Sequence, residues 1–433
     1  MGFIISFVLF IMALGSYIKE KNVTVPEVMF NMVFSVVCFF SMFVYDEGNI
    51  KICNYVALYI YLIVFSGVIS FNVGCFCLSN GKKINYQNEK IIEPIFKIFI
   101  ILCFIGLLIS CYASIKFILS GGMIIDVYKQ STNAAYIENE FYLPNFVKRF
   151  LIYIAYPLYF LLIPLLISRY FQENKIKYLF IASLFVLLKT ISHFGRVDLL
   201  YFLLYFFILL INKYGEKIEI NNSKNTNSKS KKFKKIFLYS FLLLGLIGFI
   251  FVLFVRNTNI IKTPINYFGT PLLYMQLLMN NVNKLGHTYG FLSFLGLWQA
   301  IMVPLKMFGL EMPEIFIFAQ KYQYIIADGG YLPSAGIMYN AFSTIFYYFY
   351  VDYNWFGVIV IPFILGCLSK YIYNNFINGL SIKWAVNYLM ISLVIVFSFI
   401  RCQFSRSEIV LAFVYTLFLF KRIKNIPKKN SAR

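Results

Sequence analysis

Several of the few polar residues that could do chemistry in this chain gather in the segment TISHFGRVDLLYFLL, residues 190–204. This apolar segment contains His193, Arg196 and Asp198. An arginine guanidinium binds phosphate or carboxylate through two parallel hydrogen bonds. A histidine with an ordinary pKa of about 6.5 exchanges protons near neutral pH. The segment therefore combines an anion-binding group with a candidate proton-transfer group.

Four arginines form the main candidate site, because each is predicted near the outer end of a membrane-spanning segment: Arg196, Arg256, Arg401 and Arg406. A planar guanidinium suits a bidentate anion better than the point charge of lysine does. The membrane-associated anion of that size is a lipid diphosphate. The alternative for each arginine is a side chain that reaches the interface or pairs with an acid. Four arginines on one face favour the diphosphate site.

Candidate proton-transfer groups and saccharide contacts are also predicted on the outer side. Both histidines of the chain, His193 and His287, fall there. The motif YIENEFY, residues 136–142, places two carboxylates among aromatic rings, which are typical of sugar-binding grooves. We predict catalytic roles for His193, His287, Glu138 and Glu140, and saccharide contacts for Tyr136, Tyr142 and Asp328. The alternatives are an interfacial hydrogen-bonded histidine and tyrosines that mark the membrane interface.

No metal or cofactor is predicted. Two histidines without a His-x-x-x-His spacing do not complete a typical zinc site. The eight cysteines lie mostly in or beside apolar runs, where small packing residues account for them.

The elements that must position these residues are predicted to be membrane-spanning helices. Apolar residues make up 60% of the chain and charged residues only 13%, against about a quarter charged in soluble domains. About 20 apolar residues span a bilayer as a helix, and backbone amides in hydrocarbon must be bonded within their own segment. We predict an all-α polytopic integral membrane protein with the spans 2–18, 28–45, 54–78, 91–118, 150–168, 178–194, 197–212, 236–255, 336–350, 355–373, 383–400 and 405–421. The segment 291–310 would be a thirteenth span, and Gly195 is expected to allow the turn between two spans.

The distribution of the lysines predicts the orientation of these spans. The net charge of +21 comes largely from lysines in short segments between apolar runs, as in cytoplasmic loops rather than in a nucleic-acid groove. The alternation predicts an outer N-terminus, an inner C-terminus and one membrane domain over residues 1–433. The lysine-rich loop 213–235 and the tail 421–433 would be cytoplasmic. Residues 120–148 and the large region 256–335 would be outer.

Three short motifs resemble the Wzy-type O-antigen and capsule repeat-unit polymerases. They are the Gly195-Arg196 pair opening an apolar helix, the segment from Tyr339 to Thr344, and Asp352-Tyr353 followed by Gly357, Pro362 and Gly366. Asn354 stands where these families often have glycine.

The resemblance implies a fold of the glycosyltransferase C type in the bacterial inner membrane, with a periplasmic active face. It implies transfer of a growing glycan from undecaprenyl diphosphate onto a lipid-linked repeat unit, in O-antigen, lipopolysaccharide or capsule synthesis. The partners would be undecaprenyl-diphosphate-linked oligosaccharides, the lipid bilayer and a chain-length regulator protein. Nucleic acid would not be a partner. The outer arginines would then stabilise the diphosphate leaving group.

Two other functions remain open from the sequence. An O-antigen ligase or a lipid-linked-sugar glycosyltransferase uses related chemistry, and the acids of YDEGN, residues 45–49, fit the latter. A lipid-linked oligosaccharide flippase or other transporter is expected to carry charges along a central cavity. The middle of the predicted spans is nearly free of charge, which favours an enzyme on the outer face.

Overall fold

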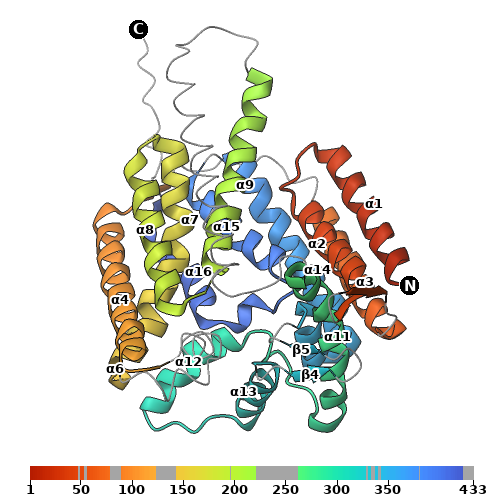
Figure 1. Cartoon of the computed structure of the whole chain (residues 1–433). Helices are drawn as coiled ribbons and strands as arrows, with labels where there is room; N and C mark the ends of the chain where they lie inside the picture. The colour runs from red at the N-terminus through yellow and green to blue at the C-terminus, as the bar shows by residue number, and fades with distance from the viewer. Residues whose placement is uncertain are drawn as a thin grey trace.

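The computed structural model is mostly helical and is shown in Figure 1. It describes residues 1–46, 49–52, 56–78, 89–122, 143–195, 197–220, 262–327, 330–332, 337–339, 343–379 and 381–422. The first half contains α1 (Gly2–Glu20), α2 (Pro26–Phe40), α3 (Leu58–Cys77), α4 (Glu93–Leu119), α6 (Asn145–Phe150), the π-helical turn η2 (Leu151–Ala155), α7 (Tyr156–Glu173), α8 (Ile176–His193) and α9 (Val197–Ile220). The second half contains α11 (Lys262–Leu285), α12 (Leu295–Met307), α13 (Glu314–Ala327), α14 (Ile345–Gly379), α15 (Ile382–Val396), the 3-10 turn η3 (Gln403–Ser405) and α16 (Ser407–Leu419).

Three short antiparallel strand pairs complete the described elements. They are β1 (Phe43–Asp46) with β2 (Asn49–Ile52), β3 (Glu89–Ile91) with β6 (Phe420–Arg422), and β4 (Gly330–Leu332) with β5 (Ile337–Tyr339). Each is too short to form an independent sheet. The strands therefore join chain segments at the ends of the helices.

The helices are those expected of a polytopic membrane protein. Among the described residues, six helical segments are long and apolar enough to cross a membrane: Gly2–Glu20, Leu58–Cys77, Glu93–Leu119, Asn145–Glu173, Ile176–His193 and Ile345–Asn378. Four shorter apolar helical segments cover Pro26–Phe40, Val197–Asn212, Ile382–Val396 and Ser407–Leu419. The predicted span 236–255 lies outside the described residues. The other predicted spans each correspond to one of these ten segments, except 291–310 and 336–350.

The prediction that 291–310 forms a thirteenth span is wrong. The helix there, α12, has 13 residues and is about 20 Å long, against a hydrocarbon core of about 30 Å. It runs beneath the long helices in Figure 1, between α16 and α13. Pro304 and Lys306 lie in its last turn and limit its apolar length.

The predicted span 336–350 is also wrong. Residues 337–339 form strand β5, and α14 begins only at Ile345. Its helical geometry is interrupted at Tyr353 and Asn354, so the part before this kink is too short to cross a membrane. Asn354 has φ 55°, and its side-chain oxygen accepts a hydrogen bond from the Trp355 amide at 2.9 Å. Glycine, and asparagine more readily than most other residues, adopts a positive φ. Asn354 therefore adopts a backbone conformation that glycine would take without strain.

The segments predicted to be cytoplasmic lie at one end of the bundle where they are described. Strand β3, before α4, pairs with β6, after α16. Glu89 of β3 pairs with Lys383 at the start of α15, at 2.9 Å. Lys370 in the last part of α14 pairs with Glu20 at the end of α1, at 3.0 Å. We call this end, which carries the lysines of the α1–α2 and α7–α8 connections and Lys421, the basic end.

The opposite end, which we call the Asp352 end, is formed by three chain segments. These are residues 286–298, the start of α14 up to its kink, and residues 397–406 between α15 and α16. The Ile345 amide donates to the Ser398 carbonyl at 2.7 Å, and the Cys402 thiol donates to the Ser293 carbonyl at 3.3 Å. The region predicted to be large and outer, 256–335, contributes α11, α12 and α13 to this end (Figure 1).

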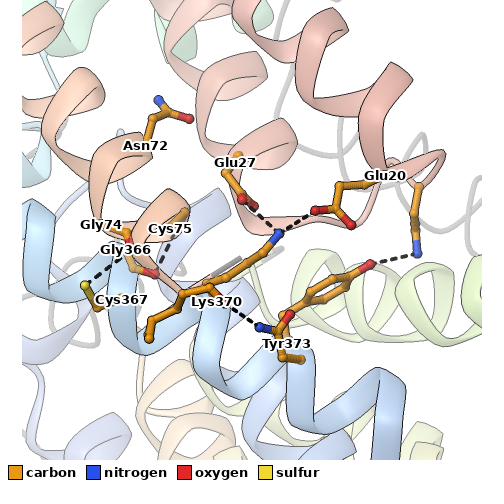
Figure 2. Close-up of polar contacts among 12 residues, drawn as sticks. Glu20, Glu27, Asn72, Gly74, Cys75, Gly366, Cys367, Lys370 and Tyr373 are labelled. Carbon is orange, nitrogen blue, oxygen red and sulfur yellow. Dashed lines mark hydrogen bonds and ion pairs between the residues drawn. The ribbon is translucent and has the colours of Figure 1, made fainter. Parts of the chain in front are cut away.

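The closest helix contact joins α3 and α14 through a repeated motif, Phe-x-x-Gly-Cys, at 71–75 and 363–367. A Cβ atom on Gly74 would collide with the Phe363 carbonyl, and one on Gly366 would collide with the Phe71 carbonyl. The thiol of each motif's cysteine donates to the glycine carbonyl of the other motif, at 3.3 Å in both cases (Figure 2). Small residues at this spacing allow backbones in a membrane to approach closely. The contact positions the end of α14, and therefore Lys370, against the α1–α2 connection.

Candidate functional site

Four of the predicted site residues lie in the described part of the chain: His193, His287, Arg401 and Arg406. All four lie at the Asp352 end. The others fall outside the described residues: Arg196, Arg256, Glu138, Glu140, Tyr136, Tyr142 and Asp328. The predicted four-arginine site is therefore represented here by the two arginines of the α15–α16 connection.

The turn between α8 and α9 places His193 at the end of its helix. Phe194 has φ 48°, a left-handed conformation that ends α8. The sequence predicted that Gly195 would allow this turn, but the positive φ lies at Phe194. Non-glycine residues adopt this conformation at the ends of helices only at some cost in energy. The turn is therefore held by its surroundings rather than by the flexibility of glycine.

Lys189 and His193 form a buried pair one helical turn apart on α8. The Lys189 ammonium lies 2.6 Å from His193 Nε2 and 3.1 Å from the centre of the Tyr156 ring. An ammonium group only donates hydrogen bonds, so His193 Nε2 accepts and the ring proton lies on Nδ1. His193 Nδ1 is shielded from solvent and has no hydrogen-bond partner among the described residues. The pair thus presents an unmatched N–H donor at the end of α8.

Helix α4 holds this part of α8 in place. The Ser114 hydroxyl donates to the Ser192 carbonyl at 2.6 Å, and the Cys111 thiol donates to the Leu188 carbonyl at 2.9 Å. Ser110 hydrogen-bonds the Tyr156 hydroxyl at 2.9 Å. These contacts fix the backbone on both sides of Lys189 and the ring against which its ammonium packs.

Arg406 joins the Lys189–His193 pair from the connection before α16. Its guanidinium pairs with Glu408 at 3.5 Å and lies 5.1 Å from the centre of the Phe160 ring. Asp198, on the first turn of α9, interacts electrostatically with both Lys189 and Arg406. We call Lys189, His193, Asp198, Arg406 and Glu408 the His193 cluster. It brings together α8, α9 and the start of α16, and sequence reasoning missed Lys189 and Glu408 as members.

Arg401 lies on the same connection, and no acid of the described residues pairs with it. It is partly buried and forms no ion pair with another described residue. Its charge acts on the hydroxyl groups of Tyr201 and Tyr348. Arg406 also acts electrostatically on the Tyr201 hydroxyl, so this tyrosine lies near both arginines. Arg401 is therefore a cation in a tyrosine-lined environment.

His287 lies on the segment that packs against this connection. Its Nδ1 lies 3.0 Å from the Val351 carbonyl, which only accepts hydrogen bonds. The ring proton therefore lies on Nδ1, and Nε2 carries a lone pair. His287 and His193 thus have different chemistry. His287 presents an acceptor that can take a proton, whereas His193 presents an N–H donor.

Asp352 anchors the segment that carries His287. Its carboxylate accepts hydrogen bonds from the Thr288 hydroxyl at 2.5 Å, the Leu292 amide at 3.2 Å and the Ser293 amide at 2.9 Å. The residue is fully buried. Its hydrogen bonds are to the protein's own loop, so Asp352 is a positioning residue rather than a general base.

The segment fixed by Asp352 contacts the arginine connection directly. Phe294 stacks on Phe404 with ring centres 6.0 Å apart. Gly296 lies so close to the backbone of Arg406 that a Cβ atom would collide with it. The structure therefore brings His287, Arg401 and Arg406 into one continuous packed region.

The electrostatic balance of this region favours an anion. In the described part of this region, Lys189 and Arg406 lie near two carboxylates, Asp198 and Glu408, and Arg401 adds a third positive charge beside Tyr201. Asp352 is separately satisfied by its three donors. No three His, Cys, Asp or Glu side chains in the described segments lie close enough together to hold a metal ion. The arrangement can bind an anionic group beside arginines and accept a proton at His287.

No protein-family model, curated protein or solved structure matches this chain.

Proposed function

We propose that this chain is a membrane glycosyltransferase that polymerises oligosaccharide repeat units carried on undecaprenyl diphosphate. The observation that supports the proposal is the surplus of cationic side chains over free carboxylates around Arg401 and Arg406, counted over the described residues, at the end opposite the lysine-bearing segments. Under the positive-inside tendency the basic end is cytoplasmic, so the reaction takes place on the outer face of the membrane.

Arg401 and Arg406 stabilise the leaving group in this reaction. The oxygen of an acceptor sugar hydroxyl attacks the anomeric carbon of the donor glycan. The bond from that carbon to the diphosphate oxygen breaks, and the electron pair leaves with the lipid diphosphate. Fixed guanidinium groups stabilise the negative charge that develops on this leaving group. Arg196 and Arg256 remain predicted contributors.

His287 receives the proton of the attacking hydroxyl. Its lone pair on Nε2 is the acceptor, and the hydrogen bond from Nδ1 to Val351 holds the ring in the required tautomer. Asp352 keeps the loop of His287 in place, while the His193 ring, whose Nδ1 is shielded from solvent, lies in the cluster around Arg406. The reaction needs no nucleotide sugar and no metal-bound intermediate.

The purified protein in nanodiscs, supplied with undecaprenyl-diphosphate repeat units from cells that lack this chain, tests the proposal. The expected product is a ladder of longer lipid-linked glycans on a gel. Transfer of the glycan only when lipid A–core is added would contradict polymerisation and indicate a ligase. Movement of intact repeat units across the membrane without chain growth would indicate a flippase.

A further inference from the structure

A second polar region lies at the basic end, where α1, α2 and α3 surround a pocket of about 480 Å³. Its lining residues are Met12, Gly15, Ser16, Lys19, Glu20, Glu27, Ile69, Asn72, Val73 and Phe76. Val73 and Phe76 are 48% and 70% exposed, so the α3 wall of the pocket belongs to the outer surface of the bundle. In a membrane this surface faces lipid.

The polar side of this pocket carries more negative than positive charge. The Lys370 ammonium lies 3.0 Å from Glu20 Oε1 and 2.9 Å from Glu27 Oε1, so two carboxylates share one cation (Figure 2). Lys370 is almost fully buried behind them. Glu27 Oε2 is shielded from solvent and has no hydrogen-bond partner among the described residues. The Glu20 side chain stays 30% exposed and lines the pocket.

The cationic side chain of Lys19 also lines the pocket. The Lys19 ammonium lies 5.5 Å from the centre of the Phe76 ring, and Ser16 lines the pocket one helical turn before Glu20. The rest of the wall is apolar, with Met12, Ile69 and Val73 extending away from the charged residues. The pocket therefore combines a carboxylate pair, a lysine and an apolar wall.

We infer that this pocket binds a phospholipid whose head group carries both a phosphate and a primary ammonium. The ammonium meets Glu20, with the charge of Glu27 behind it, and the phosphate meets Lys19. An acyl chain lies along Met12, Ile69 and Val73. The single charge of Lys370 compensates only one of the two carboxylates, and the lipid ammonium compensates the other. The site is at the end of the molecule opposite the proposed reaction, so it does not depend on that proposal.

Native mass spectrometry of the detergent-purified chain tests this site. The protein is exchanged into micelles containing equal amounts of phosphatidylethanolamine, phosphatidylcholine and phosphatidylglycerol, and the bound lipids are counted. We expect phosphatidylethanolamine to be retained in preference to the other two. Equal retention of the three lipids, or preference for phosphatidylglycerol, would overturn the inference.

Two variants locate the lipid. A Cβ atom on Gly15 would meet nothing within 4 Å, so Gly15→Leu adds a side chain to the pocket wall from an uncrowded backbone position. Glu20→Gln removes the exposed negative charge while Glu27 still pairs with Lys370. We expect Gly15→Leu to reduce the bound phosphatidylethanolamine about tenfold, and Glu20→Gln to remove the preference over phosphatidylcholine, since a difference of 1.4 kcal/mol is tenfold in binding.

The matched control is Ile4→Phe, at a lipid-facing position of α1 that does not line the pocket. It should retain lipid as the unmodified chain does. Monodisperse elution of all variants on size exclusion establishes that they are folded. If folded Gly15→Leu and Ile4→Phe proteins retain the same lipids, the pocket is not the site.

Discussion

The two ends of this molecule hold their charges in opposite ways. At the basic end, each buried cation is bound by carboxylates. Arg169 lies 2.9 Å from Glu93 and 2.8 Å from Glu173, and Lys370 is held in the same way by two glutamates. At the Asp352 end, Arg401 has no acid partner among the described residues, and the cations outnumber the free carboxylates. Affinity for an anion is therefore expected at the end with fewer lysines, because it depends on uncompensated charge rather than on the number of basic residues.

The largest expected effect tests whether the pairing of buried cations with carboxylates stabilises the basic end. Lys370→Met leaves Glu20 and Glu27 facing each other without a cation. Removing one partner of a buried ion pair costs about 3–5 kcal/mol, so we expect a clear fall in the midpoint of thermal unfolding, measured by tryptophan fluorescence in detergent.

Lys175→Ala is the matched control for that change. Lys175 also pairs with a glutamate, Glu173 at 2.9 Å, but it lies on the exposed connection after α7. We expect no measurable change in its unfolding midpoint. Equal midpoints for the two variants would mean that the Lys370 pairs are not a stabilising feature of the basic end.

The next effect tests whether Arg401, which has no acid partner among the described residues, binds the diphosphate. We expect Arg401→Ala to lower the rate of glycan-ladder formation at least about 100-fold, as loss of a fixed transition-state donor does. Its unfolding midpoint should stay unchanged because no carboxylate of the described residues loses a partner. Arg406→Ala should lower both rate and midpoint, since Glu408 loses its partner. If Arg401→Ala keeps the full rate, the unpaired arginine does not hold the diphosphate.

A loss of similar size is expected from the histidine that presents a free lone pair. His287→Asn keeps a donor toward the Val351 carbonyl but cannot take up a proton. General-base catalysis is worth about 100-fold or more, so we expect the rate to fall by that factor at an unchanged unfolding midpoint. The rate comes from the same ladder assay. A fully active His287→Asn protein would reduce His287 to a positioning role.

The smallest effect concerns the kink that shapes the Asp352 end. Asn354→Ala forces alanine into a sparsely populated backbone conformation, φ 55° and ψ −142°, at a cost of about 1–3 kcal/mol. Asn354→Gly should be neutral within about 0.5 kcal/mol, because glycine adopts positive φ without strain. Thermal unfolding of the two variants measures the difference. Equal unfolding midpoints would indicate that the kink is not under conformational constraint.

The amino-acid sequence predicts most of the helices and little of the site. Apolar runs such as that of α4 must form helices in hydrocarbon because backbone groups have no other partners there. The two wrong predictions concern the apolar segments 291–310 and 336–350. Their apolar length indicated membrane spans, because length alone does not show that a segment packs against other parts of the chain. In α12 the close approach of Gly296 to Arg406 depends on a contact across more than a hundred residues.

The sequence by itself determined the helical membrane architecture and the predicted separation of lysines from most arginines. These features depend on local composition and backbone conformation. Only the tertiary structure decided which charges meet. Lys189, Asp198 and Glu408 come from three helices, and Glu20, Glu27 and Lys370 from both ends of the chain. Whether a charge is compensated depends on neighbours brought together by packing, so the difference between the two ends is a property of the fold.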